Sequence, residues 1–122
     1  MINFKYKFKF YVNAKHNVTI NSKKSNIHPH TWEVITFLSV SKTEIINFSE
    51  FENNLTHYFE AFEGKYLNDL KSFENIEPTM EHMACIFFNE ISALIENKDF
   101  NLETIEISEN PTRTYIISSI DD

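Results

Sequence analysis

Three histidines near the N-terminus have the residue type and the spacing that could bind a metal ion. His16 ends one segment of alternating polar and apolar residues, and His28 and His30 begin the next, separated only by Pro29. Side chains two residues apart on a strand point to the same side, so His28 and His30 would face one way. If the two segments pair as a hairpin, the three imidazoles converge. Three neutral nitrogens with an open fourth position are typical of catalytic zinc sites; on spacing alone, unrelated surface or core histidines are the alternative.

The two segments that carry these histidines have the alternation expected of half-buried β-strands. In residues 4–16 the even positions are apolar or aromatic until His16, whereas lysines occupy several odd positions. After a polar loop, a second run starts at His28. Its residues of shared parity are His30, Trp32, Val34 and Leu38. We therefore predict two paired strands with one buried face that ends at the histidines.

Two amphipathic helices are expected in the middle of the chain. Ser49 and Glu52 have the spacing of a capping box, which predicts a helix over roughly Glu50 to Phe62. Its apolar positions are Phe51, Leu55, Phe59 and Phe62. Pro78 indicates the start of a second helix, with Thr79 as its N-cap. The residues predicted to be buried on this second helix are Ala84, Phe87, Phe88, Ile91, Leu94 and Ile95.

Two more strands are predicted near the C-terminus, over Leu102 to Glu109 and Arg113 to Ile120. The residues 110–112, Asn-Pro-Thr, indicate the turn between them. The resulting order is strand, strand, helix, helix, strand, strand. We predict an α+β fold with a four-stranded antiparallel sheet covered on one face by two helices, in a single domain over residues 1–122. The lysine-rich opposite face could pack against another subunit.

Composition limits the class of protein. The 122 residues carry a formal net charge of -7, which disfavours a nucleic-acid-binding role. The sequence holds one cysteine, so no disulfide can form within the chain, and we expect a cytoplasmic protein. The N-terminal segment alternates lysine with aromatic residues, unlike a signal peptide, and no segment has the length of a membrane span.

The ordered motifs of the chain resemble those of 6-pyruvoyl-tetrahydropterin synthase and its bacterial relative of queuosine biosynthesis, 6-carboxytetrahydropterin synthase. The motifs are residues 12–16 (VNAKH), 28–32 (HPHTW), 77–81 (EPTME), Glu109 before a Pro-Thr turn, and Tyr115. The resemblance covers nearly the whole chain. It implies the tunnelling fold, in which three subunits join their sheets into a barrel and two trimers stack, with the ligand pocket between subunits.

The resemblance also implies roles for individual residues. Zinc would be bound by His16, His28 and His30, and the pterin ring would be anchored by Glu109, with Thr79 as a further substrate-binding residue. A carboxylate can accept parallel hydrogen bonds from the 2-amino and ring N–H groups of a pterin. Without the resemblance, Glu109 reads as a solvent-exposed glutamate at the end of a strand.

The chain departs from the family at the groups that transfer protons. Lys24 stands where the family has a cysteine, and Glu63 and Gly64 stand where it has an Asp-His pair; Pro29 replaces a glycine between the zinc histidines. Lys24 and Glu63 are therefore the candidate catalytic residues, because Gly64 cannot transfer a proton. The alternative for Lys24 is a mobile, solvated loop lysine.

Two functions follow as expectations. The first is a zinc-dependent lyase that acts on 7,8-dihydroneopterin triphosphate or a related pterin with altered proton-transfer groups. The second is a catalytically inactive paralogue that binds zinc and a pterin in a binding or regulatory role. Both would be homo-oligomers, trimeric or hexameric, without a nucleic-acid or membrane partner.

Overall fold

The computed structural model describes residues 2–40, 46–96 and 98–119. Its elements in chain order are β1 (Phe4–His16), β2 (Thr19–Ile20), β3 (Lys23–Lys24), β4 (His28–Val40), α1 (Phe48–Glu60), the 3-10 turns η1 (Leu67–Asp69) and η2 (Lys71–Phe73), α2 (Met80–Leu94), β5 (Phe100–Asn110) and β6 (Arg113–Ser118). Within the described ranges, no helix is both long and apolar enough to cross a membrane.

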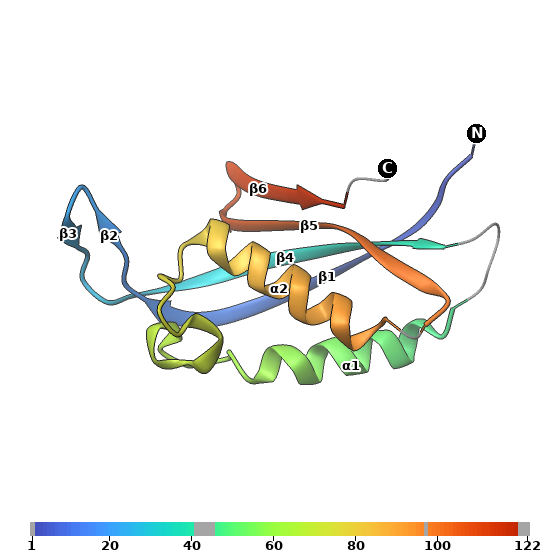
Figure 1. Ribbon diagram of the computed structural model, residues 1–122, viewed down its shortest axis with the longest axis horizontal. Helices are drawn as coiled ribbons and strands as arrows, with labels where there is room; N and C mark the ends of the chain where they lie inside the picture. The colour runs from blue at the N-terminus through green and yellow to red at the C-terminus, as the bar shows by residue number, and fades with distance from the viewer. Residues whose placement is uncertain (1, 41–45, 97, 120–122) are drawn as a thin grey trace.

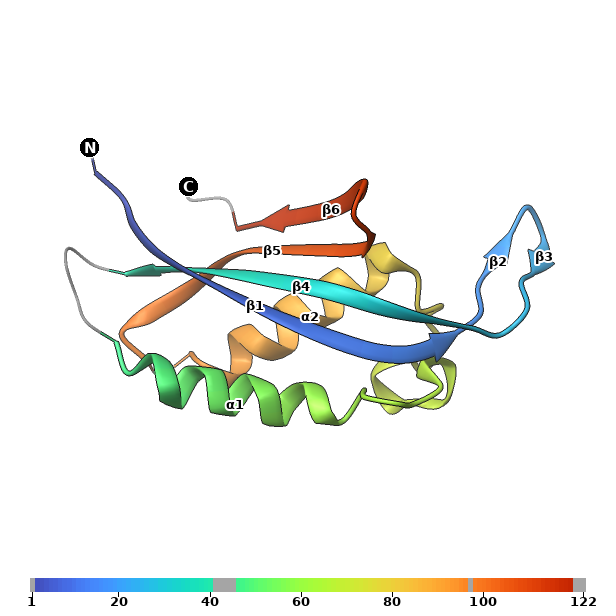
Figure 2. The same cartoon turned by 180° about the vertical axis from the view of Figure 1, so that it is seen from behind.

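The main sheet contains four antiparallel strands in the order β1-β4-β5-β6. Both helices lie on the same face of this sheet, with α2 nearer to β5 and β6 and α1 nearer to β1 (Figures 1 and 2). The predicted α+β class and the order of strands and helices are therefore confirmed. We call the face of the sheet without helices the open face.

Alternation along β1 follows the prediction. Its even positions face the helices and become fully buried toward the C-terminal end, at Val12, Ala14 and His16, while its odd positions are exposed. The register with β4 places His16 opposite His28 and Ala14 opposite His30. Periodicity in the sequence thus decides which side chains reach the buried end of the sheet.

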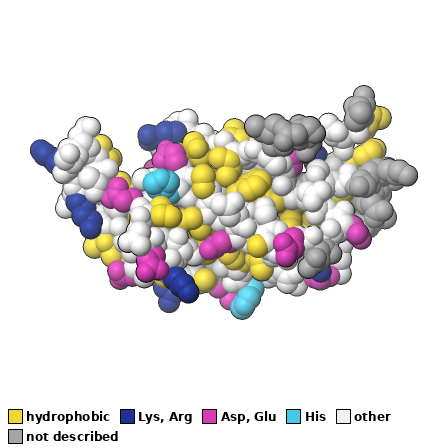
Figure 3. Space-filling view, in the orientation of Figure 1, with side chains coloured by type: hydrophobic (Ala, Val, Ile, Leu, Met, Phe, Trp, Pro, Cys, Tyr) yellow, Lys and Arg dark blue, Asp and Glu magenta, His cyan; other side chains and the backbone are white. Residues whose placement is uncertain are grey.

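The connection between β1 and β4 is more ordered than the predicted polar loop. The strands β2 and β3 pair as a small ribbon that projects from the end of the sheet (Figures 1 and 2). Its two-residue turn, Asn21 and Ser22, has positive φ angles of 51° and 66°. Such angles at both positions are typical of the hairpin turn whose twist matches the flanking strands. In Figure 3, basic side chains gather toward the end of the molecule that carries this ribbon.

The core lies between the helices and the sheet, and aromatic rings fill much of it. Trp32 and Phe87 are among the largest fully buried side chains. Phe59 and Phe62 of the α1 region each pack edge-on against Phe87, with ring centroids 5.3 and 5.1 Å apart. Edge-to-face contacts of this kind add to the stabilisation from buried area. These contacts join the α1 region to α2, and Phe10 of β1 packs against Phe59 with ring centroids 5.4 Å apart.

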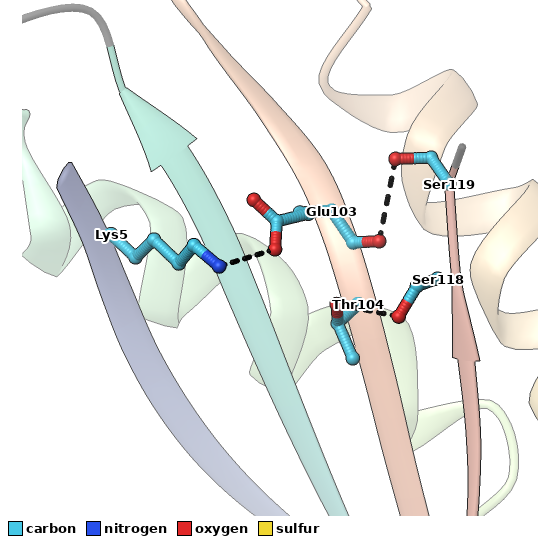
Figure 4. Close-up of polar contacts among 5 residues, drawn as sticks. All are labelled: Lys5, Glu103, Thr104, Ser118 and Ser119. Atoms are coloured by element: carbon cyan, nitrogen blue, oxygen red, sulfur yellow. Dashed lines mark hydrogen bonds and ion pairs between the residues drawn. The ribbon is translucent and has the colours of Figure 1, made fainter. Parts of the chain in front are cut away.

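Side-chain hydrogen bonds connect strands of the main sheet. Lys5 of β1 reaches over β4 to Glu103 of β5, with Nζ 2.6 Å from the carboxylate (Figure 4). The Thr104 and Ser118 hydroxyls lie 2.9 Å apart between β5 and β6. Lys9 of β1 also lies 3.6 Å from the carboxylate of Glu33 in β4, so acidic residues of β4 and β5 partly neutralise these two lysines.

Several predicted boundaries were wrong. Helix α1 begins at Phe48 and ends at Glu60, and its N-cap is Asn47, whose side chain accepts a hydrogen bond from the Glu50 N–H at 3.1 Å. Ser49 is therefore inside the first turn and does not cap the helix. Phe62 is buried just beyond the helix end.

The C-terminal elements also differ in detail. Thr79 is the N-cap of α2, as predicted. Leu94 is 53% exposed, because it lies at the last residue of α2, where the helix leaves the core. The first C-terminal strand starts earlier, at Phe100, and β6 ends at Ser118. The predicted end of that strand, Ile120, lies outside the described residues.

We predict that Asn47→Ala lowers the free energy of unfolding by about 1 kcal/mol, because the Glu50 N–H loses its capping acceptor. Urea denaturation of the metal-free protein measures this change. Ser49→Ala is the matched control and should change stability by less than about 0.5 kcal/mol, as expected of a surface substitution. Equal losses in the two variants would show that Asn47 is not the cap that matters.

Candidate metal and ligand site

The structure brings the three predicted histidines together at one end of the main sheet. One ring nitrogen from each of His16, His28 and His30 lies within 4.8 Å of the other two. The ring centroids of His16 and His28 are 4.6 Å apart, and those of His28 and His30 are 4.8 Å apart. The end of β1 supplies one imidazole, and the start of β4 supplies two that point the same way.

Backbone carbonyls fix the tautomers of two of these histidines. His16 Nδ1 lies 2.7 Å from the Pro78 carbonyl oxygen, and His28 Nδ1 lies 2.8 Å from the Asn26 carbonyl oxygen. A carbonyl oxygen can only accept, so each Nδ1 carries the proton and donates it. Each Nε2 of the neutral rings is then left with a lone pair.

These two lone pairs point at each other across a short distance. His16 Nε2 and His28 Nε2 are 2.9 Å apart. Two acceptors cannot form a hydrogen bond with each other, so this spacing is favourable when the two nitrogens share a cation, either a proton or a metal ion. Neutral imidazoles whose Nδ1–H groups are held by carbonyls are the usual form of zinc-binding histidines. The ligand set therefore fits Zn²⁺.

His16 is the most buried of the three and has a lowered pKa. Only 2% of its surface is exposed, and burial is the main cause that lowers the pKa of its imidazole below the ordinary value; nearby His28 and His30 act in the same direction. The hydrogen bond to Pro78 and the Glu109 carboxylate oppose this shift. A neutral imidazole at neutral pH has the lone pair that a metal requires.

Trp32 connects the histidines to Glu109. Its indole lies against both His16 and His30, with ring centroids 4.9 and 5.1 Å apart. Its Nε1–H donates a long hydrogen bond, 3.4 Å, to Glu109 Oε1. Glu109 also lines a cavity of about 370 Å³, whose other lining residues include Tyr11 and Glu33 from the open face. The predicted anchor thus lies beside the histidine cluster, with one carboxylate oxygen weakly engaged.

Thr79 lies near the histidine cluster, because it directly follows Pro78, whose carbonyl contacts His16. Its Oγ1 accepts the His82 N–H at 3.1 Å and caps α2, and the preceding residue, Pro78, holds His16. The hydroxyl of Thr79 still has its own hydrogen to donate. Adjacent residues therefore cap α2 and hold the histidine cluster.

Comparison with known proteins gives the family. A family model described as 6-pyruvoyl tetrahydropterin synthase matches residues 5–119. The chain belongs to this family. None of the curated proteins compared with the chain matches it.

Solved structures of this family have the same fold. The 6-pyruvoyl tetrahydropterin synthase of Caenorhabditis elegans has a TM-score of 0.82 and 16% identity, covering 98% of each chain. A Plasmodium vivax 6-pyruvoyltetrahydropterin synthase with a catalytic glutamate replaced by alanine has a TM-score of 0.74 and 10% identity, covering 96% of this chain and 98% of that chain. The 6-pyruvoyl tetrahydropterin synthase of Plasmodium falciparum has a TM-score of 0.73 and 12% identity, covering 96% of this chain and 98% of that chain. The sheet and its two helices are the tunnelling fold.

Against the family pattern, the structure does not bring Lys24 to the histidines. Lys24 is exposed in β3, on the projecting ribbon. Among the described residues, its side chain makes no hydrogen bond or ion pair with the cluster. Lys24 is thus exposed on the ribbon, and its catalytic role stays a prediction.

Glu63 is engaged with β1 on the outer side of the sheet edge. One of its carboxylate oxygens accepts the Asn13 backbone N–H at 2.9 Å, and the other accepts the Asn13 side-chain amide at 2.8 Å. Gly64 follows with a φ of 72° and donates its N–H to the Asn13 carbonyl at 2.6 Å. Gly64, His30 and Thr31 line a cavity of about 360 Å³. In this chain the pair that matches the family's Asp-His therefore holds the edge of β1.

Sequence reasoning missed two parts of the site. The Pro78 carbonyl that holds His16 is a backbone group 62 residues away in the chain, and no side-chain pattern marks it. The buried Asn17, directly after His16, was also missed. The sequence feature that could have indicated Asn17 is its type and place: it is a polar residue that directly follows a strand ending in a candidate metal ligand.

Proposed function

We propose that this chain binds about one zinc ion per subunit through His16, His28 and His30 and acts on 7,8-dihydroneopterin triphosphate or a related pterin as a lyase. The observation that carries the metal assignment is the convergence of three histidine ring nitrogens within 4.8 Å of one another, on rings of which two have their Nδ1 protons held by carbonyls. Family membership supports the pterin assignment. When bound, zinc would polarise a side-chain hydroxyl or carbonyl of the ligand.

Glu109 is proposed to anchor the pterin ring. Its position next to Trp32 places a carboxylate near the histidines, and the 3.4 Å hydrogen bond from the indole leaves most of its acceptor capacity for a ligand. Parallel hydrogen bonds from the 2-amino group and the ring N–H would satisfy both oxygens. Thr79, at the start of α2, is the second proposed ligand-binding residue, through its free hydroxyl hydrogen.

A second candidate function is a protein that binds zinc and a pterin without turnover. It is favoured by the exposure of Lys24 and by the engagement of both Glu63 oxygens with Asn13. The Plasmodium vivax relative, whose catalytic residue is a glutamate, favours the lyase, because it indicates that a carboxylate can serve as a catalytic group in this family. Lys24 could still act as an acid or base if the ribbon moved toward the ligand.

We also propose that the chain assembles into a trimer or a hexamer, with the ligand pocket completed between subunits. The strands β1 and β6 are the two edges of the main sheet. Residues 64–66 contact the edge of β1 near Asn13 and Lys15. Natural proteins seldom leave long edges unpaired, and closure of several sheets into a barrel removes them. The cytoplasm is the proposed compartment, in keeping with a single cysteine.

We predict that protein purified without chelators contains about one zinc per subunit, because three histidine ring nitrogens converge on one point. Metal analysis should show that His28→Ala and His30→Ala each lose most of it. His57→Ala is the control, since the His57 side chain is 88% exposed on α1 and far from the cluster in sequence. Equal zinc in all four proteins would contradict the site.

We predict that Glu109→Gln weakens binding of neopterin or sepiapterin by roughly 1.5 to 3 kcal/mol, because a charged acceptor is lost. Calorimetric titration of the zinc-loaded protein measures this change. Glu106→Gln is the matched control, from the same strand but facing the opposite side of the sheet. Absence of pterin affinity in the unmodified protein would remove both proposed functions.

The same preparation separates the lyase from the binding protein. Product analysis after incubation with dihydroneopterin triphosphate should show turnover above a zinc-only control if the lyase proposal holds. Lys24→Ala should abolish that turnover and leave pterin affinity unchanged, whereas Lys23→Ala, also exposed on the ribbon, should have little effect. Pterin binding without product formation would establish the binding protein instead.

The oligomer gives an independent prediction. Light scattering at micromolar concentration should give the mass of a trimer or a hexamer, because the free edges of the sheet pair in the barrel. A monomeric mass would remove the barrel and the pocket between subunits, and would leave the histidine cluster as a site within one chain.

A further inference from the structure

Asn17 is a buried polar residue at the junction between β1 and the ribbon. It follows His16 directly and is only 7% exposed. Its backbone N–H donates to Asn68 Oδ1 at 3.1 Å, and its carbonyl accepts from Asn68 Nδ2 at 2.9 Å. The Asn68 side-chain amide therefore pairs with the backbone of Asn17 as a neighbouring strand would. This pairing fixes the peptide group that joins His16 to Asn17.

The side chain of Asn17 makes two further hydrogen bonds to different parts of the chain. Its Oδ1 accepts the Tyr66 hydroxyl at 2.6 Å, and its Nδ2 donates to the Ser25 carbonyl at 3.3 Å. The Ser25 N–H donates to the Val18 carbonyl at 2.8 Å, and the Val18 N–H donates to the Ser25 hydroxyl at 3.0 Å. All four hydrogen-bonding groups of Asn17 that lie in this junction are thus satisfied.

These contacts connect the two histidines whose Nε2 atoms face each other. Ser25 is followed by Asn26, whose carbonyl accepts the His28 Nδ1–H at 2.8 Å. Tyr66 is positioned by the edge of β1, where the Lys15 N–H donates to the Lys65 carbonyl at 2.8 Å. Asn17 is therefore the point where the strand of His16, the segment that holds His28, and residues 66–68 meet.

We propose that Asn17, held by Asn68 and Tyr66, is a positioning residue that sets the separation of His16 and His28 and thereby the metal affinity. The inference rests on the proposed zinc site. Ligand atoms that are fixed before the ion arrives bind it more tightly, because no side chain or loop has to be ordered on binding. Loss of the Asn17 contacts would release the loop that carries Asn26 and let the rings move apart.

Tyr66→Phe and Tyr58→Phe form a matched pair that tests this role. Each removes one half-buried hydroxyl that donates a side-chain hydrogen bond of 2.6 Å, from Tyr66 to Asn17 and from Tyr58 to Glu90. Tyr58 packs among the helices, against Phe59, Phe62 and Phe87. Competition with a chromophoric chelator should show zinc bound about tenfold more weakly by Tyr66→Phe, the lower end of the range for residues that orient metal ligands. Tyr58→Phe should bind zinc within about twofold of the unmodified protein.

Asn68→Ala provides a second variant and a readout of geometry. It should weaken zinc binding at least as much as Tyr66→Phe does, and it should alter the d–d absorption bands of the Co²⁺-substituted protein, which depend on ligand geometry. Thermal unfolding of the metal-free proteins controls for a general loss of stability. The positioning role would be wrong if Tyr58→Phe weakened zinc binding as much as Tyr66→Phe does and the two metal-free variants had lost the same stability.

The zinc content of the unmodified protein separates the role of Asn17 from the proposed metal site. If the unmodified protein holds no zinc, the metal site itself fails, and the positioning role fails with it. If the unmodified protein holds zinc, and both Tyr66→Phe and Asn68→Ala bind it as tightly with unchanged Co²⁺ bands, the metal site stands and the role of Asn17 is wrong.

Discussion

The antiparallel register between β1 and β4 is the constraint on which the site depends. It sets His16 opposite His28 and keeps His30 on the same face as Trp32. A shift of one residue would move every side chain of a strand to the opposite face, so the imidazoles of β4 would turn to the open face. The burial of Val12 and Trp32, both fully enclosed, opposes such a shift. The burial of these apolar side chains therefore also orients the histidine nitrogens of the proposed metal site.

Register alone does not complete the site, because two carbonyl groups from outside the main sheet decide the tautomers. Pro78 belongs to the segment that starts α2, and Asn26 belongs to the segment that leads into β4. With both segments docked, the carbonyls favour the tautomer whose Nε2 atoms present lone pairs. The ribbon and α2 are further joined by Glu77, whose carboxylate accepts the Thr19 N–H at 2.9 Å. Folding of the helical layer and formation of the histidine cluster are thus coupled.

Local pattern in the sequence predicts those features that depend on local physics. The bounds of β1, the N-cap Thr79 and the convergence of the histidines follow from alternation and capping chemistry. The cap of α1 could not be chosen this way, because Asn47 with Glu50 and Ser49 with Glu52 both have the required spacing. The contacts of Asn17 with residues about 50 positions away, and of His16 with a distant carbonyl, are tertiary, so no local pattern contains them.

Groups for binding and groups for proton transfer lie on different kinds of element in this chain. The histidines and Glu109 are carried by the long strands of the main sheet, whose register fixes them. Lys24 lies on a two-stranded ribbon outside that sheet, and the pairing of two such short strands contributes little stability by itself. Freeing Glu63 would leave the Asn13 amide groups without their acceptors at the edge of β1. The proposed metal and pterin binding would therefore use groups already held in place, whereas the proposed turnover would need an acid or base brought by movement of the ribbon or by another subunit.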